Sequence, residues 1–386
     1  MKLSTDRILT THVGSLPRPD GLLALLRQED RGEAVDEHAL HASTTEAVKQ
    51  AVDDQVAAGI DVVCDGEMSK ISYHVYARHR LSGLVSTDGT GVPGRPAPAD
   101  FHDFPEMLEG FIGGGGTELM QATICDGPVA YADHAPLERD IANLQAAAAD
   151  AEPADTFMNS VSPGCLSTYV PNRYYASRDD YREALIEAMR PEYNAIHAAG
   201  FVLQIDCPDL AGARHTDYQE MNEEEFLADA EKSIEALNAA TSDIPPEAMR
   251  MHICWLNYAG PHTHDIPIKR LIGLLSKARP QALLFEGANP RHAHEWEDWK
   301  VAEIPDHKVL VPGVIDSTSN FVEHPVLIAQ RICQYADIVG RERVLAGSDC
   351  GFGTYAGRKG VFPSVVTAKL QALAEGARIA SERLWN

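Results

Sequence analysis

The sequence lacks the features that mark a membrane or secreted protein. It has no run of about 18 apolar residues that could span a bilayer, and its first residues, MKLSTDRILTTHVGS, lack the apolar stretch of a signal peptide. Its seven cysteines are an odd number, which is atypical of a disulfide framework and favours free thiols or metal ligands. We therefore expect a cytoplasmic protein.

Basic residues are also few. The 386 residues include 33 Lys and Arg against 57 Asp and Glu, which gives a net charge of −24. Such a charge repels the phosphates of nucleic acids and anionic lipid head groups. The sequence thus predicts small-molecule ligands, with neither nucleic acid nor membrane as a partner.

Apolar segments of strand length alternate with helical patterns along the chain, as in repeated βα units. Eight such units predict an α/β fold, a (β/α)8 TIM barrel, with residues 1–386 as a single domain. The expected strands are residues 8–15, 61–67, 156–162, 201–208, 249–255, 282–287, 308–316 and 343–350. The expected helices are residues 45–58, 180–199, 223–240, 268–277, 325–339 and 363–384.

Residues 71–151 depart from this alternation. They contain the turn-rich segment STDGTGVPGRPAPADFHDFPE, followed by EGFIGGGGTELMQATICDGPVAYAD, whose pattern is that of an excursion hairpin. We expect an insertion here, after the second strand. The glycine run at 113–116 is not followed by the Lys-Ser/Thr of a phosphate loop, so it is interpreted as a flexible connection within the hairpin.

His252 and Cys254 lie two residues apart in RMHICWLNY, so both side chains face the same side of an expected strand. Taken alone, this pair fits buried packing as well as it fits metal binding. Cys350 ends the last expected strand and Glu286 ends the sixth, and the carboxyl ends of barrel strands converge. Because imidazole and thiolate groups are common zinc ligands, His252, Cys254, Glu286 and Cys350 predict a Zn²⁺ site.

These four residues, in the contexts MHICWLNY, LLFEGAN and AGSDCGFGT, resemble the zinc ligands of the cobalamin-independent methionine synthases. The segments HVGSLPRP, CDGEMSK and LQIDCPDL also resemble that family and occur in the family's order. The chain has the length of the C-terminal catalytic barrel alone, as in the single-barrel members and the similar epoxyalkane:coenzyme M transferases. The resemblance implies a zinc-dependent enzyme that transfers an alkyl group, methyl by preference, to a small thiol such as homocysteine, forming methionine.

The resemblance also implies how the thiol is bound. Glu67 and Asp206 match carboxylates that hold the ammonium group of the amino acid, and backbone N–H groups around Gly14 and Ser15 match its carboxylate site. His12 fits a role in orienting a site carboxylate and a buried structural role equally well.

The incoming thiol would take the open coordination position by displacing Glu286 or water. Asp316 is retained after the seventh strand, and we expect it to be catalytic.

The sequence departs from the methionine synthases at two positions. Thr318 stands where those enzymes have a proton-shuttling histidine, and the segment after the third strand lacks the tryptophan that stacks on the pterin. Tyr169, Tyr174 and Tyr175 are the candidates for a replacement aromatic face. Both departures weaken the case for a folate donor, so a corrinoid, a methyl-donor protein or a small electrophile stays open as the source of the alkyl group.

Other functions of the same barrel also stay open. Epoxide opening by a zinc-bound coenzyme M thiolate would need a basic pocket, for which Arg18, Lys70 and Arg214 are the candidates. A metal-dependent hydrolase would prefer ligands harder than two thiolates, and a metal-free barrel would bind no zinc.

Further histidines and cysteines carry weaker signals. His262, His264, His292 and His294 have metal-like spacings, but their polar surroundings predict solvated loops. The remaining cysteines have no spaced partners and are interpreted as packing residues; they are Cys64, Cys125, Cys165, Cys207 and Cys333.

Overall fold

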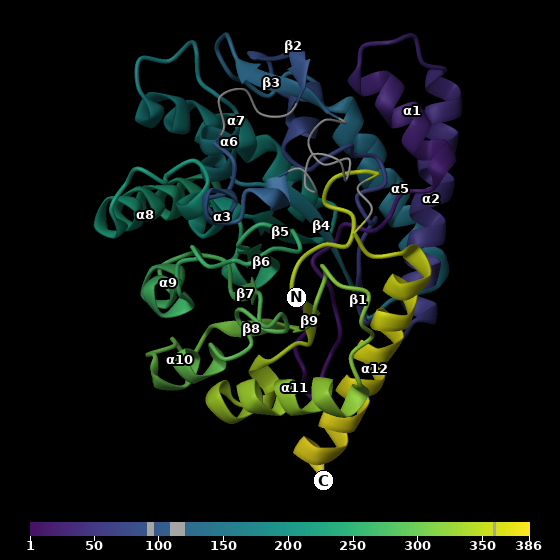
Figure 1. The fold of residues 1–386 in the computed structure, drawn as a ribbon. Helices are drawn as coiled ribbons and strands as arrows, with labels where there is room; N and C mark the ends of the chain where they lie inside the picture. Colours follow the sequence, from purple (N-terminus) through teal and green to yellow (C-terminus); the bar gives the residue numbers. More distant parts are fainter. Residues whose placement is uncertain (91–95, 109–119, 358–359) are drawn as a thin grey trace.

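The computed structural model describes residues 1–90, 96–108, 120–357 and 360–386. At its centre lies a seven-stranded parallel sheet in the order β1-β4-β5-β6-β7-β8-β9 (Figure 1). From β4 onwards each strand pairs with the next one along the chain, as expected of repeated βα units. The strands are β1 (Val62–Val63), β4 (Asp155–Val161), β5 (Val202–Asp206), β6 (Met249–His252), β7 (Ala282–Phe285), β8 (Val309–Ile315) and β9 (Gly347–Ser348).

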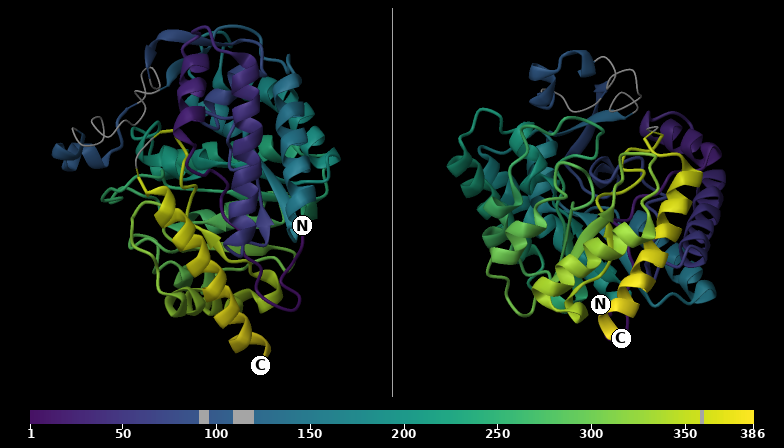
Figure 2. Two further views of the ribbon diagram at one scale, coloured as in Figure 1. Left: turned by 90° about the vertical axis from the view of Figure 1, so that its right-hand side faces the viewer. Right: turned by 60° about the horizontal axis from the view of Figure 1, so that its bottom comes forward.

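Helices lie around the outside of this sheet (Figure 2). They are α1 (Asp20–Asp30), α2 (Glu37–Ala57), α3 (Asp100–Asp103), α5 (Ala135–Ala151), α6 (Pro163–Tyr169), α7 (Arg178–Ala198), α8 (Glu223–Ala240), α9 (Ile268–Leu275), α10 (Trp296–Val301), α11 (Pro325–Val339) and α12 (Pro363–Trp385). Short 3₁₀ helices are η1 (Val75–His79), η3 (Pro208–Leu210), η4 (Gly212–His215), η5 (Pro246–Ala248) and η6 (Arg341–Arg343). Among the described helices, none combines the length and the apolar character needed to cross a bilayer.

The sequence fixes the start of α8 through its first turn. The side chain of Asn222 accepts a hydrogen bond from the backbone N–H of Glu225, and the Glu225 side chain accepts one from the N–H of Asn222. This reciprocal pair satisfies two donors that the helix itself leaves unpaired. It explains why α8 begins at the residue expected from the sequence.

We predict that Asn222→Ala lowers the free energy of unfolding by ~1 kcal/mol, because the cap oxygen is lost. Urea unfolding followed by circular dichroism measures this change. The control is Asn222→Asp, which keeps an oxygen at the cap and should retain the stability of the parent. Equal destabilisation by both changes would contradict a capping role.

The first expected strand, residues 8–15, is not a regular strand in the structure. Its backbone nevertheless bonds to both edges of the sheet, because Thr11 N donates to Ala346 O at 2.8 Å and Val62 N donates to Thr10 O at 3.0 Å. Side chains take other donors of this segment: Thr10 N bonds to Asp61 and Val13 N bonds to Ser348. The regular ladder is therefore short here, and β1 and β9, which flank this segment, are also shorter than expected.

The sheet is curled, as its buried side chains show. Val62 of β1 at one edge and Leu345 beside β9 at the other belong to the same apolar cluster, together with Phe157 of β4 and Val311 of β8. Side chains from opposite edges of a flat sheet would not meet. Arg250 of β6 lies against this cluster, with its guanidinium carbon 3.4 Å from the centre of the Phe157 ring.

Between β1 and β4 the chain forms a separate two-stranded sheet. Its strands, β2 (Leu84–Thr90) and β3 (Gln121–Cys125), are antiparallel, with Leu84 opposite Cys125. The expected connection at residues 113–116 lies outside the described residues. Helix α5 follows β3 and packs against α2.

Candidate metal and substrate site

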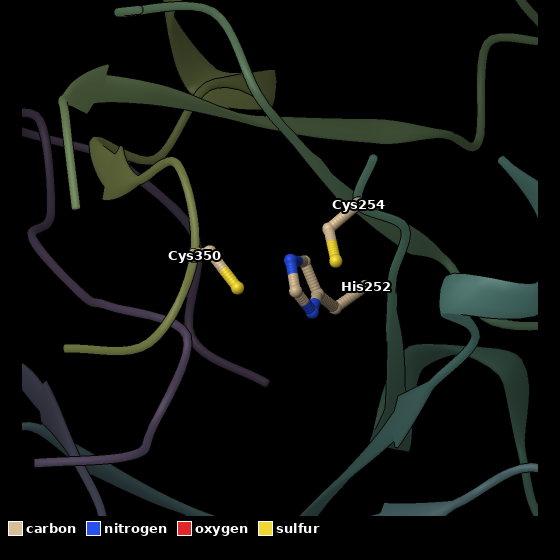
Figure 3. A group of neighbouring side chains, drawn as sticks. All are labelled: His252, Cys254 and Cys350. Atoms are coloured by element: carbon tan, nitrogen blue, oxygen red, sulfur yellow. The ribbon is translucent and has the colours of Figure 1, made fainter. Parts of the chain in front are cut away.

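Three potential metal ligands meet at the carboxyl ends of the strands. His252 is the last residue of β6, Cys254 follows two residues later, and Cys350 comes two residues after the end of β9. One donor atom of each lies within 4.8 Å of the other two, and all three side chains are buried. Figure 3 shows that both sulfur atoms point toward the imidazole ring. The expected His-x-Cys pair and the distant cysteine are thus brought together.

The chemistry of this group suits a cation. Nε2 of His252 is buried and makes no hydrogen bond to any described residue. The neighbouring Cys254 thiol, together with burial, raises the pKa of Cys350 well above its usual value. A positive ion between the two sulfur atoms would reverse that effect, because it stabilises thiolates.

Asp206, the last residue of β5, lies beside the histidine. Its Oδ1 is 3.5 Å from His252 Nδ1 and accepts a hydrogen bond from Gln204 at 2.9 Å. Its Oδ2 accepts one from Asn159 Nδ2 at 3.1 Å. A carboxylate held in this way orients the ring, so that Nε2 is left for a metal.

A cavity of about 260 Å³ opens above the three donors, and Ser15, Glu67 and Asp206 also line it. Glu67 has a backbone φ of 57°, a left-handed conformation that is uncommon for a residue with a side chain. Its carboxylate lies 3.6 Å from Arg18 and 3.9 Å from Lys70. Burial raises the pKa of Glu67, and the two cations oppose this rise.

His12 and Gly14 lie behind the cavity rather than in its lining. His12 is fully buried; Nε2 pairs with Gln55 Oε1 at 2.6 Å, and Nδ1 accepts a hydrogen bond from Gly14 N. Gly14 has a φ of 132°, and a Cβ atom there would collide with the Asn159 side chain. The structure therefore favours the buried structural role of His12, and the Gly14 N–H is already bonded within the protein.

Glu286 and Asp316 lie near the site but outside the group of three donors. Glu286 accepts hydrogen bonds from Trp255 N at 2.8 Å and from Asn289 Nδ2 at 2.7 Å. Asp316 accepts two from Thr318, both at 2.9 Å. Neither residue belongs to the cavity lining. Through its hydrogen bond with Trp255 N, Glu286 holds the backbone that follows Cys254.

No family model matches the chain. It is 23% identical over 385 residues to a methionine synthase of Sulfurisphaera tokodaii, covering 98% of this chain and 94% of the relative. A methionine synthase of Saccharolobus solfataricus is also 23% identical over 385 residues, covering 97% and 95%.

Two solved structures share the fold. A B12-independent methionine synthase from Shewanella sp. W3-18-1, in complex with selenomethionine, aligns with a TM-score of 0.70 at 18% identity, covering 98% of this chain and 99% of that chain. A putative vitamin-B12-independent methionine synthase from Listeria monocytogenes aligns with a TM-score of 0.65 at 17% identity, covering 97% and 98%. The chain is similar to methionine synthases along almost its whole length. The resemblance seen in the sequence is thereby confirmed.

Several residues that the sequence suggested for the site do not line the cavity. Arg18, Lys70 and Arg214 are absent from the described lining, as are Tyr169, Tyr174 and Tyr175. Arg18 is used within the protein, where it donates to Ser15, Leu16, Gly353 and Lys70.

The expectation of solvated loops was wrong for two of the four histidines. His262 and His292 are buried and converge on Asp265: His262 Nδ1 and His292 Nε2 each lie 2.9 Å from Oδ2. His215 Nδ1 lies 2.7 Å from Oδ1 of the same carboxylate. His264 and His294 are exposed as expected. The other five cysteines are free thiols, four of them buried and Cys333 half-buried.

The cavity also has lining residues that sequence reasoning missed. Tyr73, Tyr258 and Tyr355 provide aromatic faces, and Asn257 donates to Gly351 O at 2.6 Å. Asn257 and Tyr258 carried a usable signal, since they follow Cys254 of the metal motif by three and four residues. The other two tyrosines come from irregular segments, where no periodicity indicates which way a side chain points.

Proposed function

We propose that this protein transfers an alkyl group, methyl by preference, to the thiol of homocysteine, with Zn²⁺ held by His252, Cys254 and Cys350. The observation that carries this proposal is the juxtaposition of three buried metal donors with the carboxylates of Glu67 and Asp206 in one cavity. The relatives named methionine synthase support the same reaction.

The donors fit zinc. Two thiols and one imidazole are a usual ligand set for this metal, and an unpaired, buried Nε2 is what a ligating histidine offers. When bound, zinc would lower the pKa of a coordinated substrate thiol, so that a nucleophilic thiolate forms near neutral pH. Two sulfur ligands disfavour a hydrolase, because an electron-rich centre activates water poorly.

The residues of the cavity would hold the amino acid. Glu67 and Asp206 would accept hydrogen bonds from its ammonium group, which charge assistance strengthens. Ser15 lines the cavity and would meet the carboxylate of the amino acid, with Gly14 allowing the close approach of Asn159. The lack of any Arg or Lys among the described lining residues disfavours coenzyme M, whose sulfonate needs a cation.

Two further assignments belong to this proposal. Glu286 would complete the metal coordination until the thiol binds, and Asp316 would act in proton transfer. The donor of the alkyl group is proposed not to be a corrinoid, since the two structural relatives are described as B12-independent.

We also propose that residues 1–386 form a single (β/α)8 barrel, with residues 71–151 as an insertion after its second strand. The hydrogen bonds of Thr10 and Thr11 to β1 and Ala346 support closure, because they place residues 8–15 between the two edges of the sheet. The β2–β3 sheet supports the insertion.

The test combines metal analysis with turnover. The purified protein should contain about one zinc per chain and should form methionine from homocysteine with methyltetrahydrofolate or a small methyl electrophile as donor, and it should turn over methylcobalamin poorly. A short epoxide with coenzyme M serves as the competing reaction. Absence of bound zinc, or alkylation of coenzyme M in preference to homocysteine, would overturn the proposal.

A separate prediction concerns Asp206. Asp206→Asn should weaken zinc binding about tenfold, because the carboxylate that orients His252 is lost. Competition with a chromophoric chelator measures the affinity. Asp209→Asn is the matched control, since Asp209 is bonded to Ser162 and does not line the cavity. Equal affinities of the parent and Asp206→Asn would show that the ring needs no such support.

A further inference from the structure

Residues 96–108 form one wall of the cavity. They contribute apolar side chains to its lining: Pro96, Ala97, Pro98, Phe101 and Leu108. Resting on the proposed function, we infer that this wall makes the site select against an alkyl donor that carries an anionic group at its reactive end. Asp100 is the positioning residue that fixes the wall, and Phe101 is the specificity-determining residue.

The charged side chains of the cavity lining are acidic. Glu67 and Asp206 are its carboxylates, and none of its described residues is Lys or Arg. Aromatic and apolar residues from other elements, Tyr73, Leu256 and Tyr355, continue the surface that residues 96–108 begin. An anionic group beside the reacting carbon would lose water here and meet no compensating cation.

The size of the cavity also supports selection at the reactive end of the donor. At about 260 Å³ it lies below the range of ~300–1,000 Å³ typical of sites that enclose a whole drug-sized ligand. The thiol acceptor occupies part of this space. Only the reactive end of the donor therefore fits beside the wall, and the chemistry of that end decides the selectivity.

Asp100 fastens this wall to the loop between β6 and α9. It is buried, with 1% of its surface exposed, and its carboxylate accepts hydrogen bonds from His262 N at 2.8 Å and from Thr263 N at 3.0 Å. The hydroxyl groups of Thr263 and Tyr258 donate to it as well. Four donors on one buried carboxylate leave the segment little freedom to move.

Neighbouring contacts extend this attachment. Ala99 N donates to His215 O at 2.8 Å, and the Gln219 side chain donates to Ala97 O at 2.6 Å. The Phe101 ring packs edge-on against Tyr258, with 6.1 Å between the ring centres. The apolar side chain of Phe101 is thus held in the lining by contacts on both sides of Asp100.

Iodoacetamide and iodoacetate form a matched pair of probes for this selectivity. They have nearly the same shape, but only iodoacetate is charged, and each reacts by forming a carbon–sulfur bond as the carbon–iodine bond breaks and iodide leaves. Cys254 and Cys350 line the cavity, so their thiols report on it directly once zinc has been removed by a chelator. Peptide mass spectrometry measures the labelling rate at each.

After division by the rates with free cysteine, we expect iodoacetamide to label Cys254 and Cys350 at least ~10-fold faster than iodoacetate. Phe101→Lys, which places a cation in the wall, should reduce this preference several-fold. Asp100→Asn should reduce it as well, because the wall is loosened. Asp103→Asn is the control, since Asp103 in the same helix is exposed and pairs with His264.

Equal corrected rates for the two probes in the parent protein, or a preference that Phe101→Lys leaves unchanged, would overturn the inference. The second arm uses the zinc-loaded protein with homocysteine and the same two probes, and measures the S-alkylated product. No product with either probe, combined with selective labelling of the cysteines, would refute the proposed function and leave the charge selectivity standing.

Discussion

Cys254→Ser and Cys350→Ser should each leave the protein nearly free of zinc and lower alkyl transfer by more than ~100-fold. Each change removes one of the two thiolates from a group whose donor atoms lie within 4.8 Å of one another. A serine hydroxyl is a poor zinc ligand, because it keeps its proton at neutral pH. Elemental analysis and a homocysteine alkylation assay measure the two effects together.

The control for this pair is Cys333→Ser. Cys333 is a half-buried free thiol on α11 and lies outside the site. Its replacement should leave both the zinc content and turnover unchanged. Full zinc occupancy in Cys254→Ser and in Cys350→Ser would place the metal elsewhere in the molecule.

Glu67→Gln should raise the KM for homocysteine by roughly 10- to 100-fold, because a charge-assisted hydrogen bond to the ammonium group is lost. The zinc content should not change, since Glu67 is not one of the three grouped donors. The amide is close in shape to the carboxylate, so the cavity keeps its form. Steady-state kinetics with homocysteine measures the effect.

The discriminating control is a different substrate, 4-mercaptobutanoate, which resembles homocysteine without its amine. The parent and Glu67→Gln should use this thiol almost equally well. If the substitution raised the KM for both thiols to the same extent, Glu67 would act by holding Arg18 and Lys70 in the protein and not by binding the amine of the substrate.

Much of the site could be predicted because its residues lie at the ends of regular strands or just beyond them. Period-two alternation predicted that His252 and Cys254 face the same side, and parallel strands carry the residues at their ends to a common edge. Cys350, almost a hundred residues later, could be assigned to the same edge by that rule alone.

The buried histidines, the cavity wall and the contacts of Arg18 depend on interactions that no sequence periodicity encodes. His262 and His292 occur in polar segments, but Asp265 gathers them into the interior through hydrogen bonds between residues up to 27 positions apart. Residues 96–108 have no regular hydrophobic pattern. Neither their position at the cavity nor the hydrogen bonds that the Asp100 carboxylate accepts could therefore be predicted. Arg18 was a candidate for the basic pocket of the alternative reaction, and its use within the protein was not foreseeable because its acceptors come from three separate segments.

The attachment of residues 8–15 to both edges of the sheet has a consequence for how the chain acquires its structure. Thr11 reaches Ala346, and Ile8 N donates to the Ser381 hydroxyl, across a separation of 373 residues. Contacts between such distant positions form slowly, since a long loop must close first. During synthesis on the ribosome, residues 8–15 must wait for partners that are made much later, since Ser381 follows Ile8 by 373 residues. The cavity, which needs Cys350 as well as Ser15, therefore cannot assemble until Cys350 has been made.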